Sequence, residues 1–130
     1  MLSDNTPAIK IWVVEDDPDF RRELSEMLSS VQGLECLQRF RSAEAAVEAL
    51  AEDDLPDVVL VDIHLPGANG ISFIKEAKSR YPSIHLIVLT ISENRNTVLQ
   101  AICSGASGYL LKNDSLEETA HAIQMVCDGG

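Results

Sequence analysis

Hydrophobic residues in this chain alternate between short runs of strand length and longer stretches with helical spacing. The first run, Ile9 to Val14, is rich in β-branched and aromatic residues and ends at an acidic Glu-Asp-Asp-Pro sequence, which predicts a strand followed by a turn. From Phe20 to Val31, apolar residues then recur every three or four positions, which predicts a helix. Gly33 stands where a glycine often ends a helix. Residues 9–33 are therefore predicted to form one strand and one helix.

The same alternation continues through the rest of the chain and predicts five strands and five helices. The remaining strands are predicted over 34–40, 57–62, 84–90 and 108–111, and the remaining helices over 43–50, 71–81, 92–103 and 116–127. Ser42 occupies an N-cap position, and Leu55-Pro56 is expected to end the helix that Ser42 begins. Ser115 with Glu118 has the spacing of a capping box, which predicts the start of the last helix.

Two of the predicted strands, 57–62 and 84–90, are almost continuously apolar, which is typical of strands buried on both faces of a parallel sheet. Strands that alternate with helices form right-handed βαβ units, with helices on both faces of the sheet. We therefore predict an α/β protein: a five-stranded parallel sheet of the flavodoxin-like, doubly wound (βα)5 type with strand order 2-1-3-4-5. The 130 residues fit one domain, with a core over about 8–127, an N-terminal extension over 1–7 and the start of a possible linker at 128–130.

The acidic composition changes this picture little but excludes one class of function. Twenty-one Asp and Glu residues against ten Lys and Arg give a formal net charge of -11. Proteins that grip nucleic acid need clustered Lys and Arg, so we expect no direct nucleic-acid binding by these residues. The charge does permit a site in which carboxylates bind a divalent cation.

Cysteine usage and the absence of targeting signals suggest a reducing compartment. Cys36, Cys103 and Cys127 have neither disulfide-framework nor zinc-ligand spacing and are predicted to be buried thiols. The sequence shows no signal-peptide pattern and no apolar run of membrane-spanning length, so we expect a cytoplasmic protein with no membrane partner.

Polar residues follow the predicted strands at their carboxyl ends, where doubly wound sheets carry their sites. Glu15 and Asp16 follow the first strand, Asp62 ends the third, Thr90 ends the fourth and Lys112 follows the fifth. In strand order 2-1-3-4-5 the first and third strands are neighbours, so three carboxylates meet and favour a bound cation. Mg²⁺ fits best because it takes a few carboxylates, keeps waters and completes its shell with phosphate oxygens. A carboxylate beside Mg²⁺ can act as the nucleophile toward a phosphoryl group.

At this point the sequence resembles the receiver domain of two-component response regulators. The resemblance covers about residues 8–127 and rests on four motifs in the family's order, namely Val13-Val14-Glu15-Asp16-Asp17-Pro18, Val61-Asp62-Ile63-His64-Leu65-Pro66-Gly67 with Asn69-Gly70, Val88-Leu89-Thr90, and Gly105-Ala106-Ser107-Gly108-Tyr109-Leu110-Leu111-Lys112. Each motif alone is weak, but four on successive strand ends are a specific signal.

The resemblance implies a role for each residue of the carboxyl edge. Asp62 is the expected phosphoacceptor. Asp16 is expected to bind Mg²⁺ directly, Glu15 through water, and the backbone carbonyl of His64 to supply a further ligand. The implied protein is a phosphoacceptor switch that assists its own phosphorylation and dephosphorylation, and we do not class it as an enzyme.

The resemblance also implies a conformational switch. Thr90 and Lys112 are expected to contact the phosphoryl group, and Tyr109 to rotate inward when Thr90 moves. Leu99, Ala101 and the segment 104–109 are expected on or near the surface that changes.

Two positions depart from the family's commoner pattern. Ile91 stands where a small residue is usual, and its branched side chain could crowd access to Asp62. Asn113 stands where proline usually follows the lysine, in a peptide bond that is typically cis, although a cis bond without proline costs about 2.5–4 kcal/mol. Lysine followed by Asn or Asp is similar to the NarL/LuxR-type branch of the family.

The resemblance implies partners as well. It implies phosphoryl transfer from a cognate histidine kinase or phosphotransfer protein, a possible receiver homodimer, and transcriptional control through a C-terminal helix-turn-helix DNA-binding domain of a longer protein. The alternative is a stand-alone or phosphorylation-independent receiver that acts as a protein interaction module.

Three other classes fit the sequence less well. A dehalogenase-like phosphatase and a Toprim-like nucleic-acid enzyme both expect an acid two residues after the aspartate, where this chain has His64. A flavodoxin-like cofactor binder needs a Ser/Thr/Gly-rich phosphate loop after the first strand, where the acidic residues 15–17 would repel a phosphate.

Overall fold

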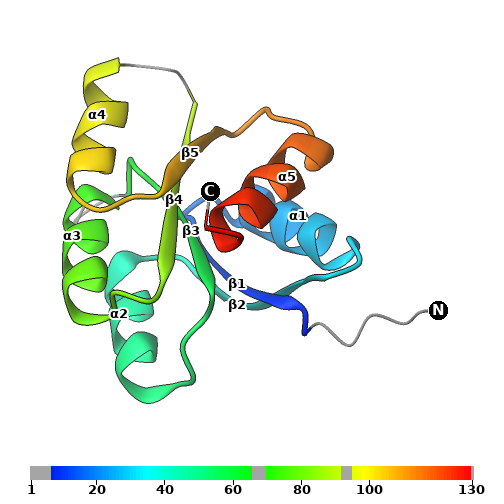
Figure 1. The fold of residues 1–130 in the computed structure, drawn as a ribbon, viewed down its shortest axis with the longest axis horizontal. Coiled ribbons are helices and arrows are strands. Elements are labelled where there is room, and N and C mark those ends of the chain that lie inside the picture. The colour runs from blue at the N-terminus through cyan, green and yellow to red at the C-terminus, as the bar shows by residue number, and fades with distance from the viewer. Residues whose placement is uncertain (1–6, 66–69, 92–94, 130) are drawn as a thin grey trace.

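The computed structural model describes residues 7–65, 70–91 and 95–129. Within them, strands and helices alternate along the whole chain (Figure 1). The strands are β1 (Ile9–Val14), β2 (Leu34–Phe40), β3 (Val58–Asp62), β4 (His85–Thr90) and β5 (Gly108–Leu111). The helices are α1 (Pro18–Ser29), α2 (Ala43–Glu52), α3 (Gly70–Arg80), α4 (Arg95–Cys103) and α5 (Leu116–Cys127).

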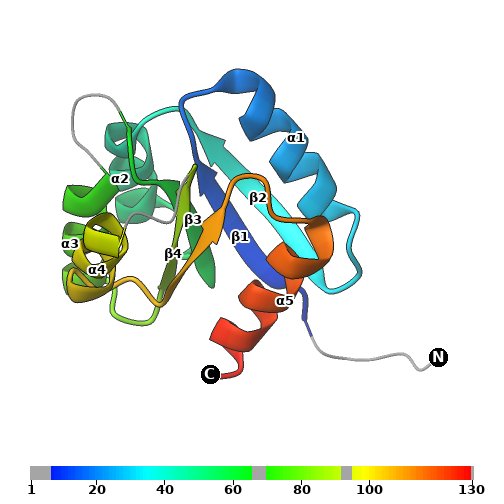
Figure 2. The same ribbon diagram turned by 90° about the horizontal axis from the view of Figure 1, so that it is seen from above.

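The five strands form one parallel sheet in the order β2-β1-β3-β4-β5, which confirms the predicted topology. Figures 1 and 2 show α1 and α5 on one face of the sheet and α2, α3 and α4 on the other. Chain order reverses between β1 and β3, the position at which such sheets place their sites.

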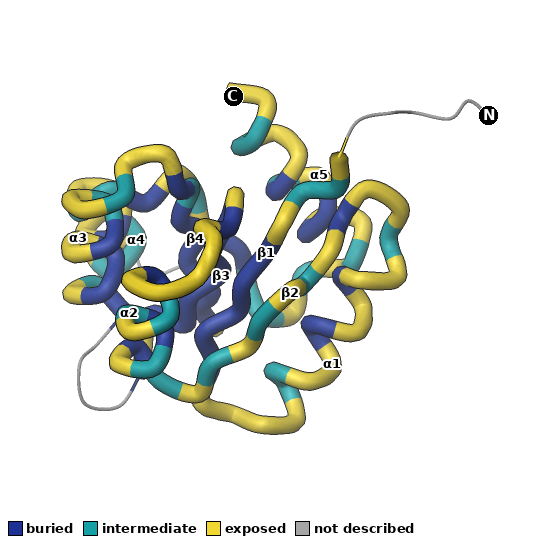
Figure 3. Tube along the Cα trace, turned by 90° about the horizontal axis from the view of Figure 1, so that it is seen from below, coloured by how far each residue is buried: buried dark blue, intermediate teal, exposed yellow. Residues whose placement is uncertain are grey.

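Strand alternation divides the core into two layers because successive side chains of a strand point to opposite faces. In β1, Trp12 and Val14 pack on the side of α2, α3 and α4, whereas Ile11 and Val13 pack on the side of α1 and α5. The central strands are buried on both faces, and exposed positions gather on the outer sides of the helices (Figure 3). The continuous apolar runs were therefore correctly interpreted as central strands.

Side-chain caps begin three of the helices. The Asp17 carboxylate accepts backbone N–H groups at the start of α1, and Ser42 Oγ accepts the N–H of Ala45 at the start of α2. Ser115 and Glu118 form the predicted capping box of α5, because each side chain accepts the other residue's backbone N–H. Caps of this kind satisfy N–H groups that a helix cannot pair internally.

Some helix boundaries differ from the predictions. α1 ends at Ser29, and Gly33 lies in the turn before β2 with φ +94°, so its left-handed conformation belongs to that turn. α2 ends at Glu52 with Asp53 as its C-cap, before Leu55-Pro56. The predicted start of the fourth helix at residues 92–94 lies outside the described residues, and α4 is described from Arg95.

The burial prediction for the cysteines was wrong. Cys103, the last residue of α4, is exposed, and Cys36 and Cys127 are only half-buried where they pack against the core. Of the residues expected on or near the changing surface, Leu99 of α4 is exposed, whereas Ala101 of the same helix packs into the core. No helix of the described residues is both long and apolar enough to cross a membrane.

Candidate functional site

Three carboxylates meet at the carboxyl edge of the sheet, beside the point where strand order reverses. Glu15 and Asp16 directly follow β1, and Asp62 is the last residue of the neighbouring strand β3. One carboxylate oxygen from each lies within 4.8 Å of the others. Glu15 and Asp62 are buried, whereas Asp16 is exposed. The structure thus brings together the three acids that the sequence predicted as neighbours.

Glu15 is fixed by several contacts although its side chain is fully buried. Its backbone N–H donates to the carbonyl of Phe40 (2.9 Å), which holds the end of β1 against β2. Its Oε2 accepts the backbone N–H of Asp17 (3.0 Å). Its Oε1 lies 2.7 Å from Lys112 Nζ but has no hydrogen bond of good geometry among the described residues. A buried carboxylate oxygen without such a bond is an unusual and costly arrangement.

Asp62 has both carboxylate oxygens engaged. Oδ1 accepts the backbone N–H of His64 (2.9 Å), and Oδ2 accepts a hydrogen bond from Lys112 Nζ (3.1 Å). These two contacts fix the orientation of the carboxylate at the end of β3.

Lys112 joins the two buried carboxylates. Its side chain is 20% exposed, and its Nζ lies 5.1 Å from the ring centroid of Phe20, within the range of a cation–π contact. Its backbone N–H donates to the carbonyl of Thr90 (2.8 Å), which ties the end of β5 to the end of β4.

Burial and the neighbouring charges shift the two coupled groups. Desolvation by burial raises the pKa of Glu15, and the charge of Asp62 acts in the same direction. The close contact with the Lys112 ammonium and the hydrogen bond from the Asp17 N–H only partly oppose the rise. Burial alone would lower the pKa of Lys112, but its hydrogen bonds and charge contacts with Glu15 and Asp62 outweigh burial and raise it. Lys112 is therefore held as an ammonium ion.

The two residues with predicted switch roles lie on the neighbouring strands β4 and β5. Their side chains point to the same face of the sheet, because Tyr109 pairs with Val88, two residues before Thr90. Thr90 is buried at the carboxyl end of β4, on the same edge as Asp62. Tyr109, in β5, is 39% exposed and lines a surface groove with Arg95, Val98 and Leu99 of α4. Tyr109 therefore has an outward orientation in this structure.

The donor set fits a hard divalent cation. Three carboxylates face one ammonium group, and Glu15 Oε1 is buried without a hydrogen bond among the described residues, so a further positive charge would be stabilising. All three carboxylates offer oxygen, the ligand that Mg²⁺ and Ca²⁺ prefer.

Sequence reasoning missed three residues that shape this edge. Arg21, which the sequence analysis did not single out, donates from Nη1 to the backbone oxygen of Glu15 (2.8 Å). Phe20, predicted as a packing residue of α1, lies under the Lys112 ammonium. Gly70 packs so closely on the loop after β3 that an added Cβ would lie 2.5 Å from the backbone oxygen of Asp62. Only the Asn-Gly pair at residues 69–70 gave a sequence signal for one of these contacts.

The structure shows the side chain of Ile91 and the peptide bond before Asn113, the two positions that depart from the family pattern. Ile91 is 73% exposed, so its side chain faces mainly solvent. No peptide bond is cis within the described ranges, which include the bond between Lys112 and Asn113.

The fold and site together define a doubly wound α/β domain with an acidic cluster and one lysine at its switch point. The family model of the response regulator receiver domain matches residues 11–124. The chain therefore belongs to the response regulator receiver domain family, as its motifs predicted.

Curated relatives agree with this assignment. The chain is 33% identical over 126 residues to the transcriptional regulatory protein DegU of Brevibacillus brevis, a match that covers 97% of this chain and 53% of that protein. It is 32% identical over 121 residues to the response regulator GacA of Pseudomonas aeruginosa, covering 93% of this chain and 56% of that protein. The chain thus spans about half the length of these relatives.

Solved structures support both the fold and the predicted branch. The signal receiver domain described as that of NarL from Mycobacterium tuberculosis superposes with a TM-score of 0.89 at 26% identity, covering 96% of this chain and all of that one. A LuxR-family response regulator from Aurantimonas sp. SI85-9A1 gives a TM-score of 0.87 at 25% identity, covering 94% of this chain and 86% of that one. The resemblance to the NarL/LuxR-type branch is confirmed at this level.

Proposed function

We propose that this receiver domain accepts a phosphoryl group on Asp62 from a histidine kinase or phosphotransfer protein. The observation that supports this proposal is the convergence of Glu15, Asp16, Asp62 and Lys112 at one point of the carboxyl edge. An acidic cluster alone would be a metal site, but the added lysine supplies a counter-charge for a phosphoryl group.

The proposed step is a nucleophilic displacement at phosphorus. An Asp62 carboxylate oxygen forms the new O–P bond as the N–P bond of a phosphohistidine breaks. The electrons of the N–P bond stay on the imidazole nitrogen, which can then take up a proton. Catalysis then consists mainly of positioning and charge neutralisation. The Lys112 ammonium, already within 3.1 Å of Asp62, neutralises the phosphoryl oxygens, and Thr90 at the neighbouring strand end donates its hydroxyl.

Mg²⁺ is the proposed cofactor, held by Glu15, Asp16, Asp62 and the backbone carbonyl of His64. Bound there, it would balance charge among the carboxylates and the incoming phosphoryl group. The receiver thus assists its own phosphorylation and dephosphorylation as a switch and is not proposed to be an independent enzyme.

The proposed output is a population shift of the surface formed by α4 and β5. Thr90 would close on the phosphoryl group, and Tyr109 would turn inward from its exposed position. Residues 1–130 would act as one receiver unit whose changed surface favours a receiver homodimer or releases a C-terminal DNA-binding domain. We propose the cytoplasm as its location, since kinases and DNA targets of this kind lie there.

The test is incubation with Mg²⁺ and acetyl phosphate, followed by intact-mass measurement of wild type and Asp62→Asn. We expect the wild type to gain one phosphoryl group, and both the substitution and chelation of the metal to abolish the gain. Equal labelling of the two proteins would refute Asp62 as the acceptor. Absence of labelling, together with no binding of a phosphoryl mimic, would instead favour a stand-alone or phosphorylation-independent receiver.

A further inference from the structure

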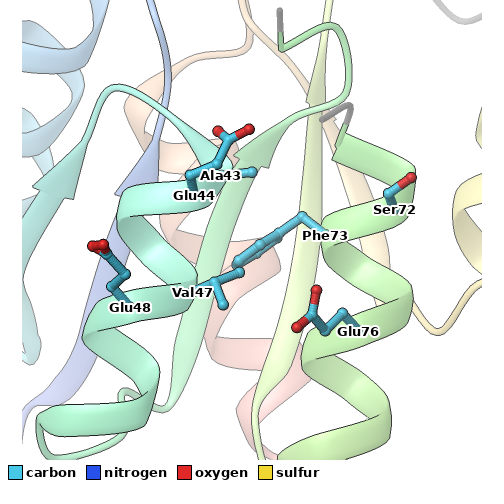
Figure 4. A pocket seen from close by; sticks show the side chains of 7 residues that line it. All are labelled: Ala43, Glu44, Val47, Glu48, Ser72, Phe73 and Glu76. Carbon is cyan, nitrogen blue, oxygen red and sulfur yellow. The ribbon is translucent and has the colours of Figure 1, made fainter. Parts of the chain in front are cut away.

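A groove between α2 and α3 shares no lining residue with the acidic cluster at the carboxyl edge. It has a volume of 270 Å³, and the residues that line it are Ala43, Glu44, Val47, Glu48, Ser72, Phe73 and Glu76. Figure 4 shows the Phe73 ring reaching from α3 toward Val47 on α2, with the carboxylates of Glu44 and Glu76 on either side of this apolar pair. A dry cavity of about 150 Å³ is enough to bind a benzene ring. The groove can therefore hold one large apolar side chain.

Helix α2, which forms one wall of this groove, carries a row of glutamates along one face. Glu44, Glu48 and Glu52 recur at every fourth position of α2, which contains neither Lys nor Arg. Glutamates with this spacing lie on the same face of a helix and repel one another. Among the described residues neither Glu44 nor Glu48 forms an ion pair.

The opposite wall adds a carboxylate that is only weakly neutralised. Glu76 of α3 lies 3.7 Å from Arg80, in an ion pair whose two side chains are both about half exposed. Such exposed pairs contribute little. The groove therefore combines an apolar floor with a rim of negative charge from both helices.

We propose that the α2–α3 groove is a docking site for a basic amphipathic helix of a partner protein. The partner would insert one aromatic or leucine side chain against Val47 and Phe73. Lysines or arginines one turn away from this anchor would face Glu44, Glu48 and Glu76. This binding mode combines a helix in an apolar groove with charge complementarity at its rim.

The charge of the chain itself argues for a basic partner rather than a second copy. With a net charge of -11, a second molecule would bring further negative charge to a rim that is already negative. A helix is the fitting shape because its side chains repeat every three or four residues, as the glutamates of α2 do. The residues that line the groove are separate from those of the proposed phosphorylation site, and the inference does not depend on phosphorylation.

The probe for the test is a synthetic amphipathic helical peptide, with Trp and Leu on one face and Lys on both flanks. Its binding to the full chain is measured by fluorescence anisotropy of a dye-labelled peptide and mapped by amide chemical shifts of the ¹⁵N-labelled protein. We expect shifts centred on α2 and α3, and an affinity that falls as salt is raised. A peptide with every Lys replaced by Glu should not bind.

Three variants separate the groove from general charge attraction. The double variant Glu44→Gln with Glu48→Gln, at exposed positions, should weaken binding roughly tenfold. Val47→Phe should weaken it at least as much without any change of charge, because the new ring fills the groove. The matched control, Glu23→Gln with Glu26→Gln on α1, removes the same charge from another face and should leave the affinity unchanged.

Several results would overturn the proposal. Equal weakening by the α1 control would show diffuse attraction to an acidic protein. Shifts centred on Glu15 and Asp62 would show binding at the carboxyl-edge cluster instead. Unchanged affinity in the Glu44/Glu48 variant would remove the charged rim from the explanation, even if Val47→Phe failed to fold. Self-association through α2 and α3 without peptide binding would assign the groove to a second copy.

Discussion

Replacement of Lys112 by methionine tests how the two buried carboxylates are stabilised. Methionine keeps most of the length and apolar stem of the side chain but removes the ammonium that lies 2.7 Å from Glu15 and 3.1 Å from Asp62. The variant leaves a fully buried glutamate beside a second buried carboxylate. We expect the metal-free protein to lose stability.

The magnitude follows from the distances and the burial. With an effective dielectric constant of about 20, the two attractions amount to about 6 and about 5 kcal/mol before desolvation is counted. Desolvation of the charges offsets most of this, and removal of one partner of a buried pair typically costs about 3–5 kcal/mol. Because the Lys112 side chain remains 20% exposed, we expect a loss near the lower end, about 3 kcal/mol.

The assay is urea unfolding of wild type and Lys112→Met, with a chelator and again with excess Mg²⁺. The midpoint of the variant should fall without a change in m-value. Mg²⁺ should narrow the difference, because a metal and the ammonium neutralise the same carboxylates. Lys75→Met, at an exposed position of α3, removes the same charge elsewhere and should be nearly neutral. A Lys112→Met midpoint equal to that of the Lys75 variant, or a difference that Mg²⁺ does not narrow, would refute the reasoning.

Three further predictions address the loop, a helix cap and the thiols. Gly70→Ala should slow labelling by acetyl phosphate and destabilise the fold by roughly 1–3 kcal/mol, because its Cβ would meet the backbone oxygen of Asp62, the proposed phosphoacceptor. Gly108→Ala, with open space around the added Cβ, is the control, and equal effects of the two substitutions in urea unfolding would contradict the contact. Backbone and side-chain hydrogen bonds with its N-cap serine lower the pKa of Glu118, so its charge stabilises the fold above the unfolded pKa and this contribution is lost as pH falls through the folded pKa. The stability difference between wild type and Glu118→Gln should therefore be present at neutral pH and close in acid, and a difference independent of pH would argue against the cap. In maleimide labelling near pH 8 followed by peptide mapping, exposed Cys103 should react well before Cys36, whose pKa burial raises to about 11; the reverse order would contradict the described burial.

The fold was largely predictable because each element carries its own signal. The alternation of apolar runs with helical spacing predicted the elements and the parallel sheet, and the doubly wound fold class supplied the strand order. Ser42 and Ser115 marked helix starts that the structure confirms. The boundary errors arose where two signals compete. A glycine with positive φ is found both at helix ends and in turns before strands. Gly33, with φ +94°, belongs to the turn before β2 and not to the end of α1.

The site was predictable where it depends on strand ends and not where it depends on tertiary contacts. Glu15, Asp62 and Lys112 follow or end strands, so topology alone brings them together. The hydrogen bond from Arg21 to the backbone of Glu15 depends on how α1 packs beside the loop after β1, and periodicity describes only which face of a helix is apolar. The Asn-Gly pair marked Gly70 in the sequence, but its close approach to the backbone of Asp62 appears only in three dimensions.

The end of β5 links the proposed chemistry to the outer surface. The register of β4 and β5 pairs Val88 with Tyr109 and Thr90 with Leu111, and the Lys112 N–H continues this ladder to the carbonyl of Thr90. A one-residue slip of a strand would move every side chain to the opposite face, so a small event at the site cannot move these strands past each other. The proposed signal must therefore pass through side chains.

Thr90 is buried and Tyr109 is partly exposed on adjacent strands of this fixed ladder, so a movement of Thr90 toward a phosphoryl group changes the space beside the strand on which Tyr109 stands. A shift between two tyrosine orientations then needs no rearrangement of the sheet, and a ligand that binds one orientation better is sufficient to select it.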